Sequence, residues 1–353
     1  MNAKTSTPVR LGMIGVGYVG QVGHLLNFLE ADNCDVVAIA DLRSGLRETV
    51  RSHHGIPAAY ETHHELLQNE DVDAVAVVTR PYHVGAIALD CLNAGKHVFT
   101  EKPMAVTIDQ SEKLVAAAAA NDVRYAVGYM RRYDTGVQLA KRKLDEVMQS
   151  GELGRVLFAR FYCFGGEDFC NCPGAVGLGE PRPDGIESWP KAPDWLPAEH
   201  AGAYIRFMNI YIHDLNLMRY LFGRTPQPEH FRLVSDQHGS AAFDFGDFQA
   251  VLECAEMAQD EWTEGVEILF EKGRMTIDLP AAFRKEVPAT VTLCREGYSG
   301  RAETFTLEPS WSFRNQAQTF IDDILAGREP VSSGRDSIED SRLLEGIWRL
   351  AGA

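Results

Sequence analysis

The stretch that decides the fold is residues 9–20, VRLGMIGVGYVG. It begins as an apolar, β-rich run and ends in Gly15, Gly17 and Gly20, which have the G-x-G-x-x-G spacing. In such a strand-turn-helix the first glycine permits a tight turn, the second lets the backbone approach a pyrophosphate, and the third lets the helix pack closely on the strand. Three glycines can also make only a turn. The helical stretch that follows favours a turn that binds a dinucleotide.

An acidic residue further along indicates which dinucleotide is bound. Asp41 lies 21 residues after Gly20, at the end of the next expected strand. Its carboxylate can accept hydrogen bonds from an adenosine ribose and would repel the extra phosphate of NADP. Arg43 weakens this argument, because a guanidinium group suits a phosphate. We expect NAD as the cofactor, with NADP less favoured.

The first third of the chain continues the alternation of strand and helix. Strands are expected at 9–14, 35–40, 74–79, 97–100 and 124–127, and helices at 18–30, 42–53, 64–69, 84–94 and 108–120. This alternation predicts a doubly wound parallel sheet with helices on both faces. We therefore expect a dinucleotide-binding Rossmann domain over residues 1–132.

The pattern changes in residues 133–353. A helix at 136–148 and a strand at 156–162 precede the Pro-, Gly- and Trp-rich stretch 171–200, which we interpret as an ordered surface loop. A helix at 204–222, strands at 250–256, 265–270, 274–279 and 290–293, and helices at 313–325 and 338–350 follow. Strands so close together predict antiparallel pairing. The expected second domain, 133–353, is α+β with a mostly antiparallel open sheet, and serves substrate binding and oligomerisation.

Composition narrows the classes of partner. The 353 residues include 34 Lys and Arg against 50 Asp and Glu, a formal net charge of -16. This charge repels nucleic-acid phosphates and anionic membrane surfaces, so neither is expected as a partner. The sequence has no signal-peptide or membrane-spanning pattern, and we expect a soluble cytoplasmic protein. Seven cysteines, an odd number, favour reduced thiols over a disulfide framework.

Three further motifs resemble a known family. They are PYH at 81–83, GKHVFTEKP at 95–103 and GYMRRYD at 128–134. With the glycine turn, they resemble the glucose-fructose oxidoreductase and inositol dehydrogenase (Gfo/Idh/MocA) family, strongly over the first 135 residues and more weakly afterwards. In that family a Glu-Lys-Pro motif follows a strand of the nucleotide domain, its lysine reaches substrate and nicotinamide, and its proline often follows a cis bond. The resemblance assigns these roles to Lys102 and Pro103.

The position of Lys102 supports this role on physical grounds. A residue at the carboxyl end of a parallel strand lies at the mouth of the sheet, where doubly wound folds bind ligands. An ammonium group there can hydrogen-bond a substrate hydroxyl and stabilise the alkoxide-like charge that develops as hydride leaves. The alternative is an exposed surface lysine.

The family also has an Asp-x-x-x-His pair on a helix of the second domain, in which the histidine accepts a proton and the aspartate orients it. The matching residues here are Asn209 and His213, whose i, i+4 spacing keeps them on one helical face. Asparagine can fix an imidazole tautomer, but it has no charge to stabilise imidazolium. We therefore expect His213 to be a weaker base than in a relative with the aspartate, and Lys102 to take more of the proton transfer. The alternative is a structural histidine.

The residues around these motifs complete the expected site. The predicted cofactor residues are Gly15, Gly17, Tyr18, Val19, Gly20, Asp41, Arg43, Thr79, Pro81, His83, Glu101 and Lys102. The predicted substrate residues are Lys102, Tyr129, Arg131, Arg132, Trp189, Trp195, His200, Tyr204, Arg206, Asn209 and His213. Aromatic faces suit the C–H surfaces of sugars, and arginine and histidine suit hydroxyl or acidic groups. A carbohydrate or cyclitol is therefore expected, bound by loops of the second domain, although the two tryptophans can equally be inward-packed loop anchors.

Two groupings suggest metal ligands but are interpreted otherwise. Cys163, Cys170 and Cys172 have no evident fourth ligand for a structural zinc ion. The pairs His53-His54 and His63-His64 have no carboxylate at a spacing typical of a site. We expect no metal, buried or loop thiols, and surface histidines.

The predicted function is an NAD-dependent dehydrogenase or reductase that acts on a secondary alcohol of a sugar, sugar derivative or cyclitol, with Lys102 and His213 managing the hydroxyl proton. The resemblance also implies an alternative, an NAD-dependent glycoside hydrolase that uses transient oxidation of a ring hydroxyl, elimination, water addition and re-reduction. A third possibility is a non-catalytic NAD-binding regulator, against which the intact Glu-Lys-Pro motif argues. Relatives commonly pair through the open face of the second-domain sheet, which implies a homodimer or homotetramer.

Overall fold

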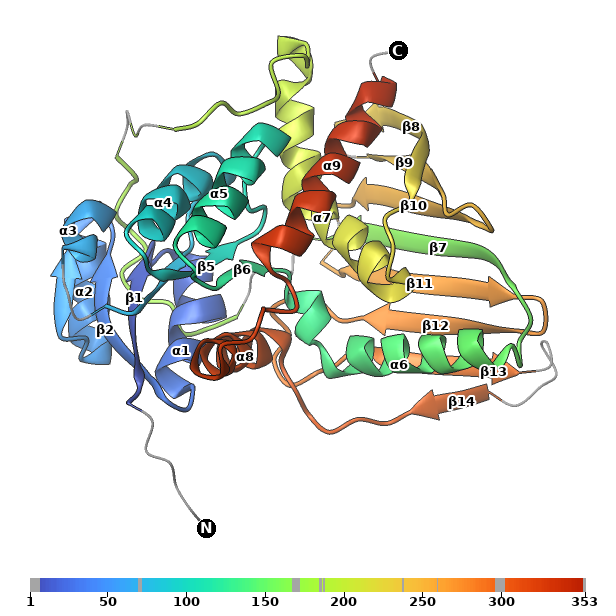
Figure 1. Cartoon of the computed structure of the whole chain (residues 1–353), viewed down its shortest axis with the longest axis horizontal. Helices are drawn as coiled ribbons and strands as arrows, with labels where there is room; N and C mark the ends of the chain where they lie inside the picture. Colours follow the sequence, from blue (N-terminus) through green and yellow to red (C-terminus); the bar gives the residue numbers. More distant parts are fainter. Residues whose placement is uncertain are drawn as a thin grey trace. The chain divides into compact units, whose positions relative to one another are not determined.

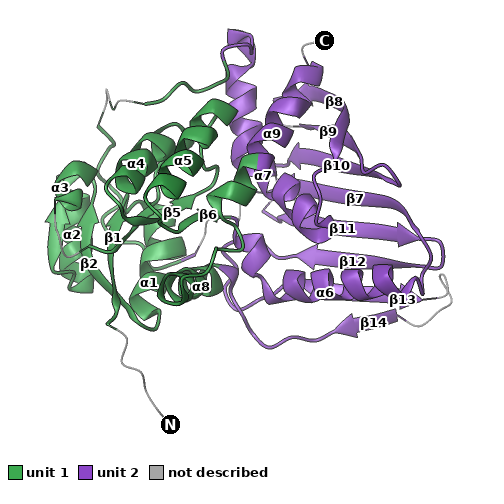
Figure 2. Cartoon of the chain, in the orientation of Figure 1, with its two compact units in different colours: residues 1–128, 173–193, 313–338 green, residues 129–172, 194–312, 339–353 purple. Residues whose placement is uncertain are grey.

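Figure 1 shows the computed structural model of the chain, which describes residues 7–68, 72–166, 172–183, 186, 188–236, 238–258, 260–295 and 302–351. The chain divides into two compact units (Figure 2). Unit 1 comprises residues 1–128, 173–193 and 313–338, and unit 2 comprises residues 129–172, 194–312 and 339–353. Unit 1 thus includes two later segments that a single boundary after residue 132 leaves in the second domain.

Unit 1 is built on a six-stranded parallel sheet in the order β3-β2-β1-β4-β5-β6. Its strands are β1 (Val9–Ile14), β2 (Cys34–Ala40), β3 (Ala58–Tyr60), β4 (Ala74–Val77), β5 (His97–Glu101) and β6 (Tyr125–Gly128). This is the Rossmann strand order, in which the direction of winding reverses between β1 and β4. Ligands of such sheets bind at the carboxyl ends of the strands beside this reversal.

Helices complete unit 1. A π-helical turn (Gly20–Leu25) continues into α1 (Leu26–Glu30), and the other helices are α2 (Ser44–His54), α3 (His63–Leu67), α4 (Pro81–Asn93), α5 (Ile108–Ala120) and α8 (Ser312–Ala326). The buried core joins strand and helix through large side chains. Phe320 of α8 lies 6.4 Å from Phe28 of α1 and 5.7 Å from Phe99 of β5, measured between ring centroids. Burial of each such ring contributes about 1.5–3 kcal/mol, which explains why this late helix folds with the first unit.

Unit 2 has an eight-stranded sheet in the order β14-β13-β12-β11-β7-β10-β9-β8. Its strands are β7 (Val156–Gly165), β8 (Gln227–Ser235), β9 (His238–Asp244), β10 (Gln249–Glu256), β11 (Thr263–Phe270), β12 (Gly273–Leu279), β13 (Thr290–Arg295) and β14 (Ala302–Phe305). Only the β7 and β10 pair is parallel among the paired strands of this sheet that the structure describes. The α/β fold class with a Rossmann sheet and a mostly antiparallel second sheet is therefore confirmed.

The helices of unit 2 pack on one face of its sheet. A 3-10 turn (Met130–Tyr133) leads into α6 (Thr135–Ser150), and a second 3-10 turn (Ala198–His200) leads into α7 (Ala201–Phe222). α6 contacts β12 and β13, and α7 contacts β7 (Figure 1). The last helix, α9 (Gly334–Ala351), ends the chain. Along β7 the side chains alternate between buried and half-exposed, as expected for a sheet with one covered face.

The structure also bears on membrane-spanning helices and on the cysteines. No helix within the described ranges has the length and apolarity that a membrane crossing needs. The cysteines that the structure describes are all free, namely Cys34, Cys91, Cys163, Cys172, Cys254 and Cys294. Cys170 and the end of the helix expected at 64–69 lie outside the described residues.

Candidate active site

The glycine turn joins β1 to the π-helical turn. Gly15 has a φ of +87°, and a Cβ at this position would lie 2.2 Å from the carbonyl oxygen of Val78. A Cβ on Gly20 would lie 2.2 Å from the carbonyl oxygen of Gly15. Both positions therefore require glycine. At Gly17 the nearest atom to a built Cβ is Nη2 of Arg43 at 3.5 Å, so the space in front of this backbone is open to a ligand.

Asp41 joins the turn to the end of β2. Its Oδ2 accepts a hydrogen bond from the backbone N–H of Val16 at 3.0 Å. Arg43 donates through Nε to Oδ1 at 2.9 Å and through Nη2 to Oδ2 at 2.8 Å, a bidentate pair. The Asp41 carboxylate is thus fixed beside the glycine turn, and the Arg43 guanidinium group balances its negative charge. The ribose contact of Asp41 stays a prediction.

Thr79, which follows β4, supports the presence of a ligand at the turn. Its hydroxyl oxygen is buried and has no hydrogen-bond partner among the described residues. A Cβ built on Gly15 would lie 3.2 Å from the Thr79 methyl group, so the two residues are neighbours. A buried hydroxyl left unsatisfied costs about 1–3 kcal/mol, which a polar ligand group at this point would relieve. The open backbone at Gly17 and this hydroxyl together fit a dinucleotide.

The other predicted cofactor residues lie near the carboxyl ends of the same strands. Tyr18 and Val19 are half-buried at the start of the helical turn. Pro81 occupies the first turn of α4, and the half-buried His83 ring lies 4.5 Å from that of Tyr82. These positions are compatible with the predicted cofactor site.

Glu101 is the last residue of β5, and Lys102 follows it. Oε1 of Glu101 lies 2.8 Å from Nε2 of His24, and its Oε2 accepts a hydrogen bond from the backbone N–H of Lys102 at 3.0 Å. The Lys102–Pro103 peptide bond is cis, as the resemblance implies. Glu101 thereby fixes the backbone at Lys102, whose side chain is partly exposed.

His24 is a site residue that the sequence analysis missed. It is 1% exposed, and its ring lies 5.2 Å from that of Phe99 and 5.4 Å from that of Phe313. Its only sequence signal is its place four residues after Gly20. In the structure it lies on a π-helical turn, and such turns are frequent at functional sites.

In unit 2, α7 carries both residues of the expected proton-handling pair. Asn209 is exposed and His213 is half-buried. The ring of Tyr129 meets that of His213 edge-on, with centroids 6.3 Å apart and planes at 88°. The next residue, Asp214, is buried, and burial together with the charge of Glu264 raises its pKa well above the usual range.

Comparisons with known proteins agree with this geometry. Residues 9–129 match the model of an oxidoreductase family with an NAD-binding Rossmann fold, GFO_IDH_MocA. A myo-inositol 2-dehydrogenase of Thermotoga maritima is 26% identical over 348 residues, which are 93% of this chain and 92% of that protein. Over residues 9–129 the chain therefore matches the Gfo/Idh/MocA oxidoreductase family.

Two further comparisons extend this result. An inositol 2-dehydrogenase/D-chiro-inositol 3-dehydrogenase of Shouchella clausii is 37% identical over 142 residues, 39% of this chain and 40% of that protein. The solved structure of an oxidoreductase domain protein from Kribbella flavida covers 98% of both chains at 17% identity, with a TM-score of 0.78, and has the same fold. The predicted family resemblance, enzyme class and NAD cofactor are therefore confirmed.

A segment of the chain that the sequence analysis assigned to the second-domain loops folds with the NAD-binding unit instead. Nε2 of Gln21 donates to the carbonyl oxygen of Val176 at 2.9 Å, and Oε1 of Gln21 accepts from the backbone N–H of Val176 at 2.8 Å. Glu180 accepts from the backbone N–H of Leu46 at 2.8 Å, in the first turn of α2. We call residues 173–193 the returning segment, and its described part is thus anchored at Gln21 and at α2.

The returning segment changes the assignment of Trp189. Its backbone N–H donates to the carbonyl oxygen of Tyr82 at 3.1 Å, and its indole is 2.6 Å from a Cβ built on Gly85. Trp189 therefore belongs to unit 1 and packs against α4. The segment also places Arg182 near Arg80 and Arg43. Burial and the charges of these two residues lower the pKa of Arg182.

Three predicted substrate residues of unit 2 have internal partners. Nε of Arg131 donates to Glu264 at 3.0 Å in a buried ion pair. Nε of Arg132 donates to Oδ1 of Asn216 at 2.7 Å. Tyr129 is 1% exposed. We correct the predicted substrate contacts of the two arginines and of Tyr129 to positioning roles around α7, because their polar groups or rings are already enclosed within unit 2.

The remaining predicted substrate residues divide into two groups. Tyr204 is fully buried 5.5 Å from the ring of Trp348, so it is a core residue and we withdraw its predicted substrate contact. Nε1 of Trp195 donates to Glu345 at 3.0 Å, which anchors that indole to α9. By contrast, Arg206 and His200 keep exposed side chains, although Arg206 pairs with Glu256 at 3.3 Å.

Proposed function

We propose that this chain is an NAD-dependent dehydrogenase or reductase of a secondary alcohol on a sugar, a sugar derivative or a cyclitol. The observation that carries the proposal is Lys102 at the carboxyl end of β5, on a backbone that Glu101 and His24 hold. The inositol dehydrogenases among its relatives support a polyhydroxylated ring as the substrate class.

The chemistry divides between the cofactor and the side chains. Bound NAD supplies the acceptor for the hydride of the carbinol carbon. The Lys102 ammonium group donates a hydrogen bond to the substrate hydroxyl oxygen and stabilises its negative charge as the proton leaves. We assign a ring nitrogen of His213 as the acceptor of that proton, with the Tyr129 ring limiting the orientation of the imidazole. Asn209 orients the imidazole without the charge that the family aspartate supplies.

The assignment of Lys102 is tested with a Lys102→Ala variant. The purified chain is incubated with NAD and a panel of inositols and free sugars, and NADH is followed by fluorescence. Loss of one charge-stabilising donor typically lowers kcat by about 10²–10³-fold, so turnover should fall by this factor while NAD affinity changes little. Lys96→Ala is the matched control, because Lys96 precedes the amino end of the same strand. Wild-type turnover by Lys102→Ala would contradict the assignment.

The same panel, extended with nitrophenyl glycosides, separates dehydrogenation from redox-neutral glycoside cleavage. Steady accumulation of NADH from a free sugar or cyclitol supports the proposal. Release of aglycone without NADH indicates glycoside hydrolysis instead. Binding of NAD without turnover of any compound would point to a non-catalytic NAD-binding protein.

A further inference from the structure

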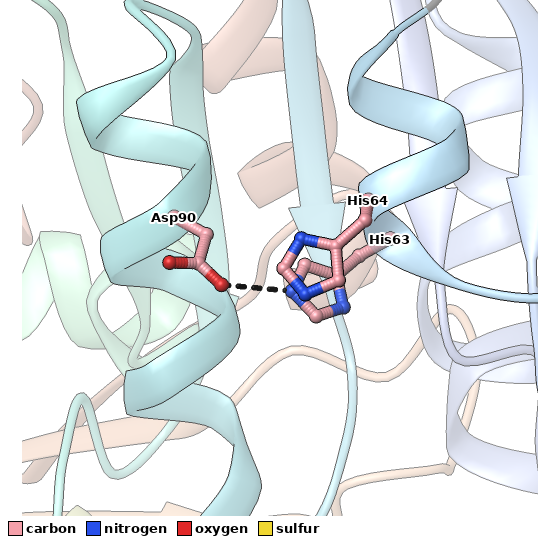
Figure 3. Close-up of side chains that lie close together, drawn as sticks. All are labelled: His63, His64 and Asp90. Atoms are coloured by element: carbon pink, nitrogen blue, oxygen red, sulfur yellow. Dashed lines mark hydrogen bonds and ion pairs between the residues drawn. The ribbon is translucent and has the colours of Figure 1, made fainter.

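Two adjacent histidines and a distant carboxylate come together on unit 1, between α3 and α4 (Figure 3). Nε2 of His63 lies 2.9 Å from Oδ2 of Asp90. The rings of His63 and His64 have centroids 3.9 Å apart. One possible ligand atom from each of the three side chains lies within 4.8 Å of the others. No second group of three such side chains occurs in the part of the chain that the structure describes.

We propose that His63, His64 and Asp90 form a binding site for a divalent transition-metal ion. Imidazole nitrogen is a good ligand for Zn²⁺, Ni²⁺ and Co²⁺, and a carboxylate oxygen completes a set of borderline donors. Ca²⁺ and Mg²⁺ are excluded as preferred occupants, because they take oxygen ligands in larger number.

The spacing of the donor atoms matches a shared ion. Metal-nitrogen and metal-oxygen bonds of about 2.0–2.2 Å at angles of roughly 90–109° place two ligand atoms about 2.8–3.6 Å apart. The 2.9 Å between His63 and Asp90 falls within this interval. An ion can therefore replace the proton that this hydrogen bond now shares, and that proton leaves to solvent. His64 is exposed, so its side chain has room to adjust toward the ion.

Access from solvent also favours binding, in which the imidazole rings ligate in their neutral form. The side chains of His63 and Asp90 are 18% and 45% exposed, so an ion reaches the site from solvent. With three protein ligands, water occupies the remaining coordination positions.

Such an ion would link a short helix, α3, to a longer and more stable one, α4. α3 has five residues, too few to be stable by itself, whereas α4 has thirteen. A metal held by both should stabilise the local structure of unit 1. The proposal is independent of the function proposed above, because none of the three residues is assigned to cofactor or substrate.

The experiment uses the full chain without an affinity tag, freed of metal with a chelator and titrated with Zn²⁺ by calorimetry and with Co²⁺ by visible absorption. We expect one saturable equivalent and a Tm that rises on addition of Zn²⁺. Asp90→Asn and His64→Ala should each lower the affinity at least about tenfold and remove the Tm rise. Circular dichroism of the metal-free variants verifies that these changes at exposed positions leave the fold intact.

His53 and His54 provide a matched control. This pair lies on α2 with ring centroids 4.7 Å apart, but it forms no three-residue group with another donor in the described ranges. A His53→Ala/His54→Ala variant should therefore keep wild-type binding. The proposal is overturned if the wild type shows no saturable binding, if Asp90→Asn and His64→Ala bind as the wild type does, or if the control loses the same equivalent.

Discussion

Each of the two carboxylate oxygens of Glu101 has its own hydrogen-bond partner. One oxygen meets the buried imidazole of His24, and the other receives the backbone N–H of Lys102. A carboxylate with both oxygens engaged has little freedom to rotate, and the peptide that follows is held with it. The buried His24 therefore fixes Glu101, and Glu101 in turn fixes the backbone of Lys102, whose side chain contacts substrate in our proposal. We interpret His24 as a positioning residue.

This interpretation predicts the behaviour of His24→Ala. Loss of the imidazole leaves one oxygen of Glu101 without its partner, and a misplacement of about 1 Å at a reacting group can cost up to about 10²-fold in rate. We expect kcat to fall by at least tenfold, with NAD affinity changed less. His24→Gln, which restores a donor of similar reach, should recover part of kcat. If His24→Ala lowers only Tm and keeps kcat, the histidine is merely structural.

Asp214 permits a prediction about stability and pH. An unfolded aspartate ionises near pH 3.9. Burial and the Glu264 charge raise the pKa of folded Asp214 well above this value, so the folded protein holds the proton more tightly than the unfolded chain does. The resulting stabilisation is fully present below pH 3.9 and is lost as pH rises toward the raised pKa, by up to about 1.4 kcal/mol per pH unit.

Asp214→Asn has no proton to lose, so it should not share this pH dependence. The difference in Tm between the variant and the wild type should grow in favour of the variant from pH 5 to pH 8. Differential scanning calorimetry at several pH values measures it. A difference that stays constant over this interval would mean that Asp214 titrates at its ordinary value.

At the scale of elements, the returning segment is the least expected part of unit 1. It comes from beyond β7 in the sequence, yet it lies against Gln21 immediately after the glycine turn. Gln21 also donates to the carbonyl oxygen of Val16 at 2.9 Å. One buried side chain thus ties the turn and the segment together. Its hydrogen bonds are expected to keep the NAD-binding backbone in place.

Gln21→Ala should therefore weaken NAD binding by about tenfold, which corresponds to about 1.4 kcal/mol. Fluorescence titration with NADH measures the change. Gln110→Ala is the matched variant, because Gln110 donates to the carbonyl oxygen of Pro190 at 3.2 Å and so releases the other end of the segment without touching the turn. It should bind NADH within about twofold of the wild type. Equal loss in both variants would assign the effect to the segment as a whole.

Some helices and strands could be predicted from the sequence and others could not. α5 has the bounds expected, 108–120, because Thr107 caps its first turn by accepting from the backbone N–H of Gln110 at 3.2 Å. β3, β8, β9 and β14 were not predicted. β3 has three half-exposed residues, and β8 and β14 are edge strands with mostly exposed side chains, so their apolar alternation is weak. The strand β9 begins His-Gly-Ser, residues of weak strand preference.

Long-range partners set a second limit on prediction. The motif at Glu101 and Lys102 is local and was found from sequence. His24 precedes Glu101 by 77 residues, and Asp90 follows His63 by 27 residues. No local pattern connects such pairs, because only the winding of the sheet brings their helices and strands together. The local sequence around His63 and His64 therefore does not indicate the carboxylate that the fold brings to them.

At the scale of the molecule, unit 2 leaves one face of its sheet without the helices α6 and α7. On this face β7 presents Phe158, Arg160, Tyr162 and Phe164, all of them half-exposed. Arg160 pairs with Glu253 of β10 at 2.7 Å, and Leu269 of β11 lies in register with Phe158. A surface of aromatic and aliphatic side chains around an ion pair is typical of a protein interface.

We propose that this open face pairs two copies of the chain, as the family resemblance implies. Light scattering coupled to size-exclusion chromatography should give a dimer or tetramer, and Phe158→Lys should shift it to a smaller species, because an unpaired ammonium group would be buried in the contact. Leu325→Lys is the matched control. Leu325 lies on α8 of unit 1, outside this sheet, and is 40% exposed. A wild type that is monomeric, or a Phe158→Lys variant that assembles as before, would contradict pairing through this face.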